Sequence, residues 1–374
     1  MNFPNINRKT IVFFLSVMLS TFCLGSTLGC LPAHAAGEDY LSSWNQTETK
    51  QAIVDFVTKV TTPGNDYVEE QDRIAVFDND GTLWSEKPLY FPIKFELEHR
   101  RLEHENFVDY TTDEYMEEAY KFVSGDKYDK QEDFDVRYLD LVYEPVIDLV
   151  NYLKANDFKV YICSGGDIDF VRSFSDQAYG IPPEQVIGTA VQTSFDGAFG
   201  GNVKRDTDFL AGMLLENKYS LEGLDNQELA QYNDREGKPV GIQNHIGKRP
   251  IIAVGNSSGD FEMFQYTDVG TDKSLIVLIN HDDCEREYQY NYEAGSTEEK
   301  CIEDETTTLL SENKYDLPSG CRDGYHLEEV PKNESLDEAV KPERTNWIVV
   351  SMQNDFNTIF NGTISDNAPG CDVE

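Results

Sequence analysis

Three short apolar runs in this chain each end in a cluster of polar side chains. The first, Ile74–Phe77, leads directly into Asp78 and Asp80. The second, residues 158–163, leads into Ser-Gly-Gly-Asp, and the third, residues 250–254, leads into Gly-Asn-Ser-Ser-Gly-Asp. Short apolar runs bounded by turn residues are typical of strands buried on both faces. Open parallel sheets bind ligands at the carboxyl ends of their strands. The pattern therefore predicts three parallel strands that bring these clusters to one edge of a sheet.

The rest of the pattern predicts further strands and helices around these three. A helical face with Ile168, Val171 and Phe174 follows the second run. The other expected elements are helices at 90–108, 113–123 and 138–155, and strands at 186–195, 275–280 and 347–351. Strands that alternate with helices in this way indicate an α/β fold.

Asp78 and Asp80 have an ordinary interpretation as well as a catalytic one. Asp, Asn and Gly are common turn residues, so the segment also fits a solvated turn. A calcium loop of the EF-hand type needs Gly at its sixth position and Glu at its twelfth. Counted from Asp78, Gly81 is fourth and Leu89 is twelfth, which excludes such a loop. In a catalytic site, one carboxylate attacks while the other transfers protons. The polar clusters downstream favour this catalytic interpretation.

The order and spacing of these clusters resemble the haloacid dehalogenase superfamily of phosphatases, in particular its phosphoserine-phosphatase-like members. The first motif of that family, Asp-x-Asp-Gly-Thr, matches residues 78–82, and the second matches Ser164, Gly165 and Gly166. The third motif is a lysine ahead of the fourth, matched by Lys238 ahead of residues 255–260. The resemblance implies a Rossmann-like, three-layer parallel sheet with an inserted helical cap.

The resemblance also implies a role for each matched residue. Asp78 would attack phosphorus and form an aspartyl-phosphate. Asp80 would protonate the leaving alkoxide and then activate the hydrolytic water. Ser164, the Gly165 amide and Lys238 would hold the phosphoryl oxygens. Asp80 favours phosphate hydrolysis over dehalogenation, because a halide leaves without a proton.

A Mg²⁺ ion is expected from the same resemblance, held by Asp78, by the backbone carbonyl of Asp80 and by the fourth motif. This chain has Asn256 where the family often has Asp, so either Asn256 or Asp260 would be the direct ligand. Lys238 lies 22 residues before Asp260, which suits the family spacing. Lys248, only 12 residues before it, is the alternative and is interpreted as a surface lysine.

The N-terminal residues have the three-part pattern of a secretory signal. A basic segment, an apolar stretch and the small residues that end at Ala36 predict a signal peptide over 1–36. A lipid anchor at Cys30 is a second interpretation. Residues 37–85 and 158–374 are expected to form the catalytic core, 86–157 the helical cap, and 292–343 an acidic surface insertion. The product would be secreted or periplasmic, with no stable membrane span.

Charge and cysteine content agree with export. The chain has 374 residues and a formal net charge of −38, which makes nucleic acid an improbable partner. Such a surface suits a salty medium, which screens self-repulsion. Cys163 is expected to act as a small apolar residue in its strand. Disulfides are expected among the other cysteines beyond the leader, first Cys301 with Cys321 and then Cys284 with Cys371.

The predicted function is hydrolysis of a small phosphorylated metabolite by an exported, Mg²⁺-dependent phosphomonoesterase. A non-catalytic binding protein on the same fold and a phosphotransferase are the alternatives. The predicted cap is rich in acids and aromatics, which are interpreted mainly as helix packing. A pocket for a cationic head group is the sharper hypothesis. Its aromatics are Tyr90, Phe91, Phe95, Tyr110, Tyr115, Tyr120 and Tyr128. His99, His104 and His245 are interpreted as polar surface residues without a catalytic role.

Overall fold

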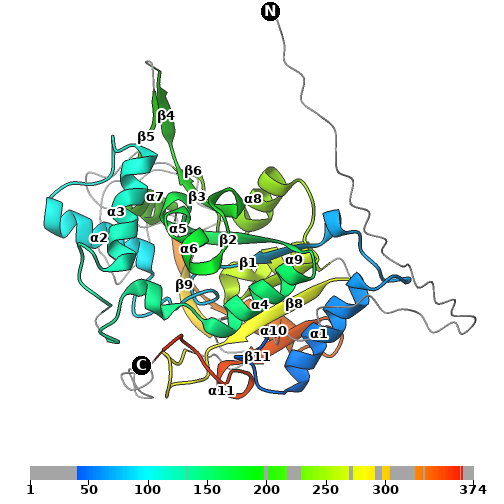
Figure 1. Ribbon diagram of the computed structural model, residues 1–374. Coiled ribbons are helices and arrows are strands. Elements are labelled where there is room, and N and C mark those ends of the chain that lie inside the picture. The colour runs from blue at the N-terminus through cyan, green and yellow to red at the C-terminus, as the bar shows by residue number, and fades with distance from the viewer. Residues whose placement is uncertain are drawn as a thin grey trace, which may run out of the picture. The chain divides into compact units, whose positions relative to one another are not determined.

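The described part of the chain has a central seven-stranded sheet in the order β11-β8-β7-β1-β2-β3-β6 (Figure 1). The computed structural model describes residues 40–131, 133–197, 201–216, 229–268, 273–290, 297–303, 325–331, 333–362 and 364. Neighbouring strands are parallel except for β6, which runs antiparallel to β3. In sheet order the strands are β11 (Trp347–Ser351), β8 (Leu275–Asn280), β7 (Ile252–Gly255), β1 (Ile74–Phe77), β2 (Lys159–Asp167), β3 (Val186–Val191) and β6 (Leu229–Gln231). The predicted α/β fold class is confirmed.

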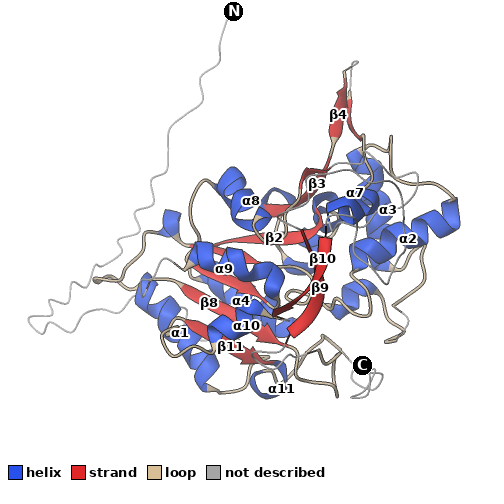
Figure 2. Ribbon diagram, turned by 180° about the vertical axis from the view of Figure 1, so that it is seen from behind, coloured by secondary structure: helices blue, strands red, loops and turns tan. Residues whose placement is uncertain are grey.

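Helices cover both faces of this sheet, and Figures 1 and 2 view the two layers from opposite sides. The core on one face contains side chains of α1 (Glu48–Thr61) and α4 (Glu144–Ala155). The core on the other face contains side chains of α8 (Gly237–Ile246), α9 (Phe261–Thr267) and α10 (Glu334–Ala339). The other helices are α2 (Phe91–Glu103), α3 (Thr112–Ser124), α5 (Ile168–Arg172), α6 (Ser175–Tyr179), α7 (Phe209–Glu216) and α11 (Met352–Asp355).

Strand β1 shows why its sequence is apolar throughout. Ala75 and Phe77 belong to the core on the α1 and α4 side, while Val76 belongs to the core on the α8 and α9 side. Successive side chains of a strand point to opposite faces, so a strand covered on both faces buries every residue. Asp78 and Asp80 end this buried run and are themselves 7% exposed.

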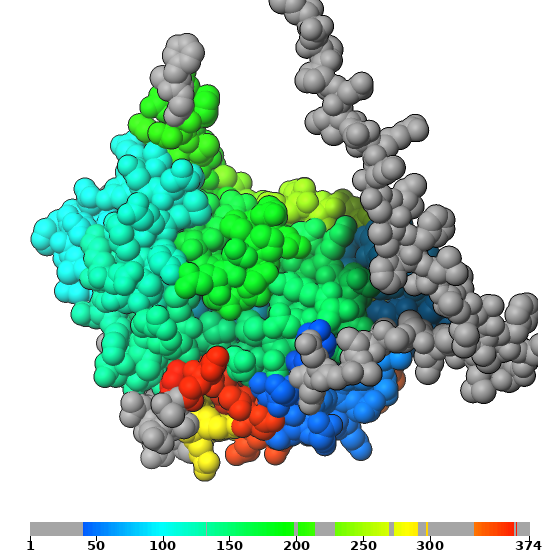
Figure 3. All heavy atoms as spheres, viewed as in Figure 1, coloured from blue at the N-terminus to red at the C-terminus, as the bar shows by residue number. Residues whose placement is uncertain are grey.

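Helices α2 and α3 lie beside one another, to the left of the sheet in Figure 1. Thr111 and Glu114 form a capping box at the start of α3, and Gly125 ends the helix in the left-handed conformation. The hairpin of β4 (Thr193–Asp196) and β5 (Asn202–Arg205) projects near them. In Figure 3 the cyan surface of α2 and α3 adjoins the green surface of the residues that follow them along the chain.

Three sequence predictions differ from the observed elements. The helix expected at 138–155 is a short 3₁₀ turn followed by α4, which begins with Pro145 in its first turn and packs against β2. The strand expected at 186–195 divides into β3 and β4 at Gln192. The range 292–343, expected to loop out, contains β9 (Thr297–Glu303) and β10 (Tyr325–Pro331), which pair with each other.

Helix α10 also falls in that range, and it packs against the core because Leu336 and Ala339 are buried there. This helix therefore belongs to the core, and the bounds 292–343 of the predicted surface insertion stay a prediction. The cap boundaries at 86 and 157 stay a prediction.

Several other predictions concern residues outside the described part. These are the signal peptide over 1–36, Cys30, Cys321 and Cys371. Cys284 is disulfide-bonded, but both predicted pairings stay predictions. Cys163 is a buried free cysteine in β2, as expected. None of the described helices is long and apolar enough to cross a bilayer.

Candidate active site

The three predicted polar clusters follow neighbouring strands of the sheet. β1 lies between β7 and β2 and is parallel to both, so the carboxyl ends of these strands share one edge. The backbone N–H of Asp78 donates to the Val254 carbonyl at 2.9 Å, which extends the pairing of β1 with β7 as far as Asp78. The fold thus brings together residues that are far apart in sequence.

A tight turn follows Asp78 and depends on Gly81. Gly81 has φ of +73°, a conformation that glycine adopts without strain. A Cβ atom at this position would lie 2.1 Å from Nδ2 of Asn256. The carbonyl of Asn79 accepts from the backbone N–H groups of Thr82 and Leu83, at 3.2 and 2.8 Å. Gly81 therefore permits both the turn and the close approach of the fourth motif.

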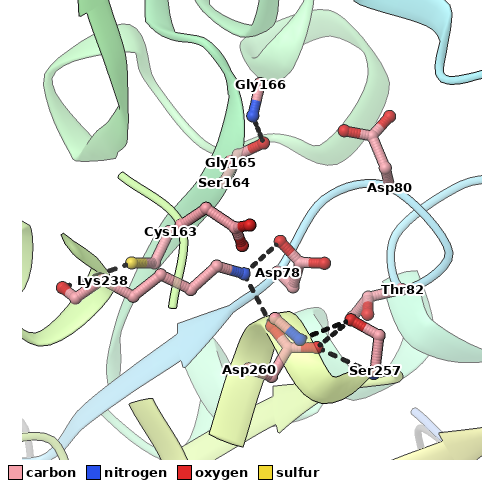
Figure 4. Close-up of polar contacts among 12 residues, drawn as sticks. Asp78, Asp80, Thr82, Cys163, Ser164, Gly165, Gly166, Lys238, Ser257 and Asp260 are labelled. Atoms are coloured by element: carbon pink, nitrogen blue, oxygen red, sulfur yellow. Dashed lines mark hydrogen bonds and ion pairs between the residues drawn. The ribbon is translucent and has the colours of Figure 1, made fainter. Parts of the chain in front are cut away.

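Lys238 links the first and fourth motifs (Figure 4). Its Nζ donates to Oδ1 of Asp78 at 2.7 Å and to Oδ1 of Asp260 at 2.6 Å, and its side chain is 2% exposed. Lys248 is exposed and instead contacts Asp72 and the Gln71 carbonyl. The structure therefore brings Lys238, and not Lys248, to the predicted nucleophile.

Asp260 organises the fourth motif. Its Oδ2 accepts from the backbone N–H groups of Asn256 and Ser257 at 2.9 and 3.0 Å, while its Oδ1 accepts from Lys238. A Cβ on Gly255 would lie 2.5 Å from the Asp260 carboxyl carbon, so glycine is needed there. Both carboxylate oxygens of Asp260 are thus engaged in holding the turn and the lysine.

The surroundings of Asp78 disfavour its charged form. Burial, followed by the charge of Asp260, raises the pKa of Asp78 well above its ordinary value, and Lys238 opposes this shift. A further positive charge nearby would favour the ionised carboxylate that a nucleophile requires.

Asp80 has a different environment from Asp78. Its Oδ1 accepts from Nε1 of Trp84 at 2.9 Å, and in Figure 4 it lies apart from Lys238. Burial is the main cause that raises the pKa of Asp80 to about 6, with the Trp84 hydrogen bond acting against it and Glu86 in favour. A carboxyl group with this pKa can both donate and accept a proton near neutral pH.

The second motif lies against the first, at the end of β2. Ser164 is fully buried, and its Oγ accepts from the Gly166 N–H at 2.9 Å. A Cβ on Gly166 would lie 3.4 Å from Oδ2 of Asp80. Gly165 and Gly166 line the cavity described below. The Gly165 amide is therefore in a position that is compatible with its predicted role in phosphate binding. The role of Ser164 stays a prediction.

A cavity of about 270 Å³ borders both aspartates. Acidic, aromatic and apolar side chains from several elements contribute to its wall. Its lining residues are Asp78, Asp80, Glu86, Tyr90, Pro92, Ile93, Gly165, Gly166, Phe209, Met213, Tyr232, Asp234, Lys238 and Ser257.

The residues beside Asp78 fit a hard divalent cation. Carboxylate and amide oxygens are the ligands that Mg²⁺ prefers. Nδ2 of Asn256 is buried and has no hydrogen-bond partner among the described residues, while its Oδ1 accepts from Thr82 Oγ1 at 3.3 Å. Turning this amide over would let Nδ2 donate to Thr82 and leave the oxygen available to a cation. Since Asp260 is fully engaged, Asn256 is the better candidate for the direct ligand.

His281 supports the catalytic turn, although no sequence motif pointed to it. Its Nε2 lies 2.7 Å from the Gly81 carbonyl, and its Nδ1 lies 3.1 Å from Oε2 of Glu287. Oε1 of Glu287 accepts from Ser85 Oγ at 2.7 Å. Its position in the sequence could have indicated this role, because His281 directly follows the buried strand β8 at the sheet edge that carries the site.

The three histidines that the sequence suggested to be surface residues, His99, His104 and His245, differ in burial. His99 is buried, not on the surface as expected, because its ring stacks on Phe107 and its Nδ1 meets the Tyr128 hydroxyl at 3.1 Å. His104 and His245 are exposed.

Comparison with known proteins gives one family match and several solved structures of low sequence identity. Residues 73–206 match the family model of the haloacid dehalogenase-like hydrolases. A conserved protein of unknown function from Anaerococcus prevotii is 16% identical, with 66% of this chain and 89% of that chain covered and a TM-score of 0.42. A phosphoserine phosphohydrolase-like protein from Francisella tularensis subsp. tularensis is 15% identical, with coverages of 56% and 88% and a TM-score of 0.29. No curated protein matches the chain.

Proposed function

We propose that this chain is a haloacid dehalogenase-like hydrolase, the family whose model matches residues 73–206, and that it hydrolyses small phosphomonoesters through a phosphorylated Asp78. One observation carries the proposal. Lys238 holds Asp78 at the edge of a cavity that also contains Asp80, whose pKa is raised to about 6. A nucleophile, a cation for the phosphoryl oxygens and a proton donor are thus adjacent.

In the first step, a carboxylate oxygen of Asp78 forms a bond to phosphorus as the bond to the alcohol oxygen breaks. Protonated Asp80 gives its proton to that departing oxygen, so that a neutral alcohol leaves. Lys238 and the Gly165 amide stabilise the negative charge on the transferred phosphoryl group.

In the second step, water attacks the phosphorus of the aspartyl-phosphate. Asp80, now ionised, takes a proton from this water, and the bond from phosphorus to the Asp78 oxygen breaks. Inorganic phosphate forms, and both aspartates return to their starting states. The ability of Asp80 to act first as acid and then as base follows from its intermediate pKa.

Asp78, the Asp80 backbone carbonyl and Asn256 would hold a Mg²⁺ ion, with Asp260 supporting the turn. When bound, the ion would offset the repulsion between the nucleophile and the phosphate. The raised pKa of Asp78 supports this assignment, because a neighbouring cation would counter the effect of burial and of Asp260.

Export is also part of the proposal, and it rests on the signal pattern over residues 1–36. The mature protein would begin after Ala36 and act in the periplasm or outside the cell. Intact-mass measurement of the protein recovered outside the cytoplasm tests this. A mass that includes the first 36 residues would contradict it.

The function is tested by release of inorganic phosphate from an aryl phosphate in the presence of Mg²⁺. The wild-type protein should release phosphate, Asp78→Asn should not, and the exposed control Asp72→Asn should match the wild type. Turnover that survives in Asp78→Asn, or no turnover by the wild type over a broad panel of esters and divalent metals, would contradict the proposal.

A further inference from the structure

The cavity beyond the two catalytic aspartates has a composition of its own. Beside the two aspartates, its lining includes the carboxylates of Glu86 and Asp234 and the rings of Tyr90, Phe209 and Tyr232, which together are called the outer pocket below. In the proposed reaction, the phosphoryl group lies at Asp78 and Lys238. The alcohol part of the ester must therefore occupy the outer pocket.

The charge of the outer pocket is negative. Glu86 is 5% exposed, and Nζ of Lys87 lies 3.8 Å from its Oε1. Asp234 is partly buried, and its Oδ2 accepts from the Tyr232 hydroxyl at 3.2 Å. Lys238 is the cationic residue of the lining, and it already pairs with Asp78 and Asp260. The cavity wall therefore carries more acidic than basic side chains.

The phenol of Tyr90, which lines the same cavity, also experiences the negative electrostatic potential of these carboxylates. Glu86 first, and then burial, Asp234, Asp80 and Asp78, raise the pKa of its phenol well above the ordinary value. Four carboxyl groups from two stretches of the chain, residues 78–86 and Asp234, therefore act on one point of the cavity. An anionic group placed there would meet the same repulsion as a phenolate.

Aromatic faces beside carboxylates form a favourable environment for an alkylammonium group. A cation over an aromatic ring gains about 0.5–1 kcal/mol when exposed and about 2 kcal/mol or more when desolvated. Pockets for drug-sized ligands measure roughly 300–1,000 Å³. The cavity here, about 270 Å³ including the phosphate position, therefore suits a short alcohol.

We propose that the substrate is the phosphomonoester of a small amino or quaternary-ammonium alcohol, whose cation lies among Glu86, Asp234, Tyr90 and Tyr232. This inference rests on the proposed hydrolysis and adds the class of leaving group. Phosphoethanolamine and phosphocholine represent the class. Phosphoserine does not, because its carboxylate would face the acids of the outer pocket.

A pair of isosteric esters tests the inference most sharply. Phosphocholine and 3,3-dimethylbutyl phosphate have the same shape, but only the first carries a positive charge. The ratio of their kcat/KM values should favour phosphocholine by about 10–100-fold. Phosphoethanolamine should likewise exceed phosphoserine. A phosphocholine ratio near one, or below it, would overturn the inference.

Variants of the outer pocket locate the effect. Glu86→Gln and Asp234→Asn should each lower the phosphocholine ratio by about tenfold. The ratio is the informative quantity because Glu86 also influences Asp80, and any such effect acts on both esters. Glu117→Gln, an exposed acid on α3 that pairs with Lys121, is the matched control and should leave the ratio unchanged. An unchanged ratio in both pocket variants would place the cation elsewhere and overturn the assignment.

Binding to Asp78→Asn separates this inference from the proposed function. Calorimetry with this variant should show tighter binding of phosphocholine than of the neutral isostere, whether or not the wild type turns over. If the wild type hydrolyses both esters equally and the variant binds them equally, the outer pocket is not a cation site although the protein is a phosphatase. If neither ester is hydrolysed but the binding preference persists, the pocket assignment stands and the proposed function fails.

Discussion

Asp78 and Asp80 are two residues apart, yet their surroundings differ in a way that suits different roles. Asp78 has a lysine at 2.7 Å and a neighbouring carboxylate, Asp260, that shares this lysine. Asp80 lies in a buried site and accepts a hydrogen bond from the indole N–H of Trp84 at 2.9 Å. The first environment fixes the position of a nucleophile, and the second gives a proton donor with a pKa of about 6.

The activity should therefore depend on pH through Asp80. Because its pKa is raised to about 6, Asp80 is protonated below this pH and loses the proton above it. With an alkyl phosphate, kcat/KM should fall about tenfold per pH unit above the pKa, since the ionised form cannot protonate the alkoxide.

Trp84→Phe should shift the alkaline limb of the kcat/KM–pH profile to higher pH by about one pH unit, because the lost hydrogen bond had lowered the pKa of Asp80. Trp44→Phe is the control, because Trp44 Nε1 donates to the Pro145 carbonyl at 2.7 Å. A limb that stays in place in Trp84→Phe, or moves equally in Trp44→Phe, would argue against Asp80 as the acid.

The two candidate lysines give a second residue-level prediction. Lys238→Met should lower kcat/KM by about 10²–10³-fold, because it removes a donor to the phosphoryl group and the counter-charge of Asp78 and Asp260. Lys248→Met should stay close to the wild type. Thermal unfolding of Lys238→Met and Lys238→Arg distinguishes lost activity from lost folding. The reverse pattern, with Lys248 essential and Lys238 dispensable, would overturn the assignment.

At the residue scale, the motif residues could be predicted from the sequence, but the residues and hydrogen bonds that hold them in position could not. Asp78, Asp80 and Lys238 were identified from order and spacing, and the structure brings Lys238 to Asp78. The engagement of both Asp260 oxygens depends on a backbone turn that no residue pattern specifies. His281 contacts Gly81 across a separation of 200 residues, which only the fold creates.

The elements were predictable where burial on both faces made the pattern simple. Strands β1, β8 and β11 have the bounds expected from their apolar runs. The interruption before α4 and the burial of α10 were not predicted. α10 is short, and hydrogen bonds to the fourth motif add to its core packing: Asn333 Nδ2, at its N-cap, donates to the Asn256 carbonyl at 3.1 Å, and Ser335 Oγ to the Ser257 carbonyl at 2.8 Å.

Arg205 is the main polar link among the elements beside the site. It ends β5, is fully buried, and donates to Asp167 Oδ2 at 2.5 Å and to Asp169 Oδ2 at 3.3 Å. Its guanidinium lies 3.7 Å from the centre of the Tyr115 ring of α3. The hairpin, α3 and the start of α5 therefore meet at one side chain.

Removing this side chain should destabilise the protein strongly. Arg205→Ala leaves the buried carboxylate of Asp167 without its cation and removes one of the two arginines that pair with Asp169, so it should lower the free energy of unfolding by about 3–5 kcal/mol. Urea denaturation measures the change. Arg101→Ala, which removes an exposed partner of Glu98, should leave the free energy of unfolding nearly unchanged. Equal, small effects of both substitutions would show that the link is not structural.

At the scale of the whole molecule, the sequence predicted the fold class because three strand ends carry matching chemistry. The net charge of −38 adds a property that the site alone does not show. A negative surface repels dianionic phosphate esters over distances set by the Debye length, about 30 Å at 0.01 M salt and 8 Å at 0.15 M.

Salt should therefore increase the rate of capture of anionic substrates. For a sugar phosphate, kcat/KM should rise about three- to tenfold between 0.01 M and 0.15 M ionic strength. Phosphocholine, whose own cation offsets part of its charge, should show a smaller rise. Steady-state kinetics at constant Mg²⁺ measure both. A fall in kcat/KM for the sugar phosphate with increasing salt would contradict this electrostatic account.

The central claim is that Asp78 becomes phosphorylated during turnover, and trapping this intermediate tests it most directly. Wild-type protein is mixed with an excess of substrate and Mg²⁺, quenched in acid during steady-state turnover, and digested for peptide mass spectrometry. The account predicts a phosphoryl group on Asp78 of the peptide that spans the first motif, and none at this peptide in Asp78→Asn. Sustained phosphate release without any phosphorylated Asp78, together with an active Asp78→Asn variant, would contradict it.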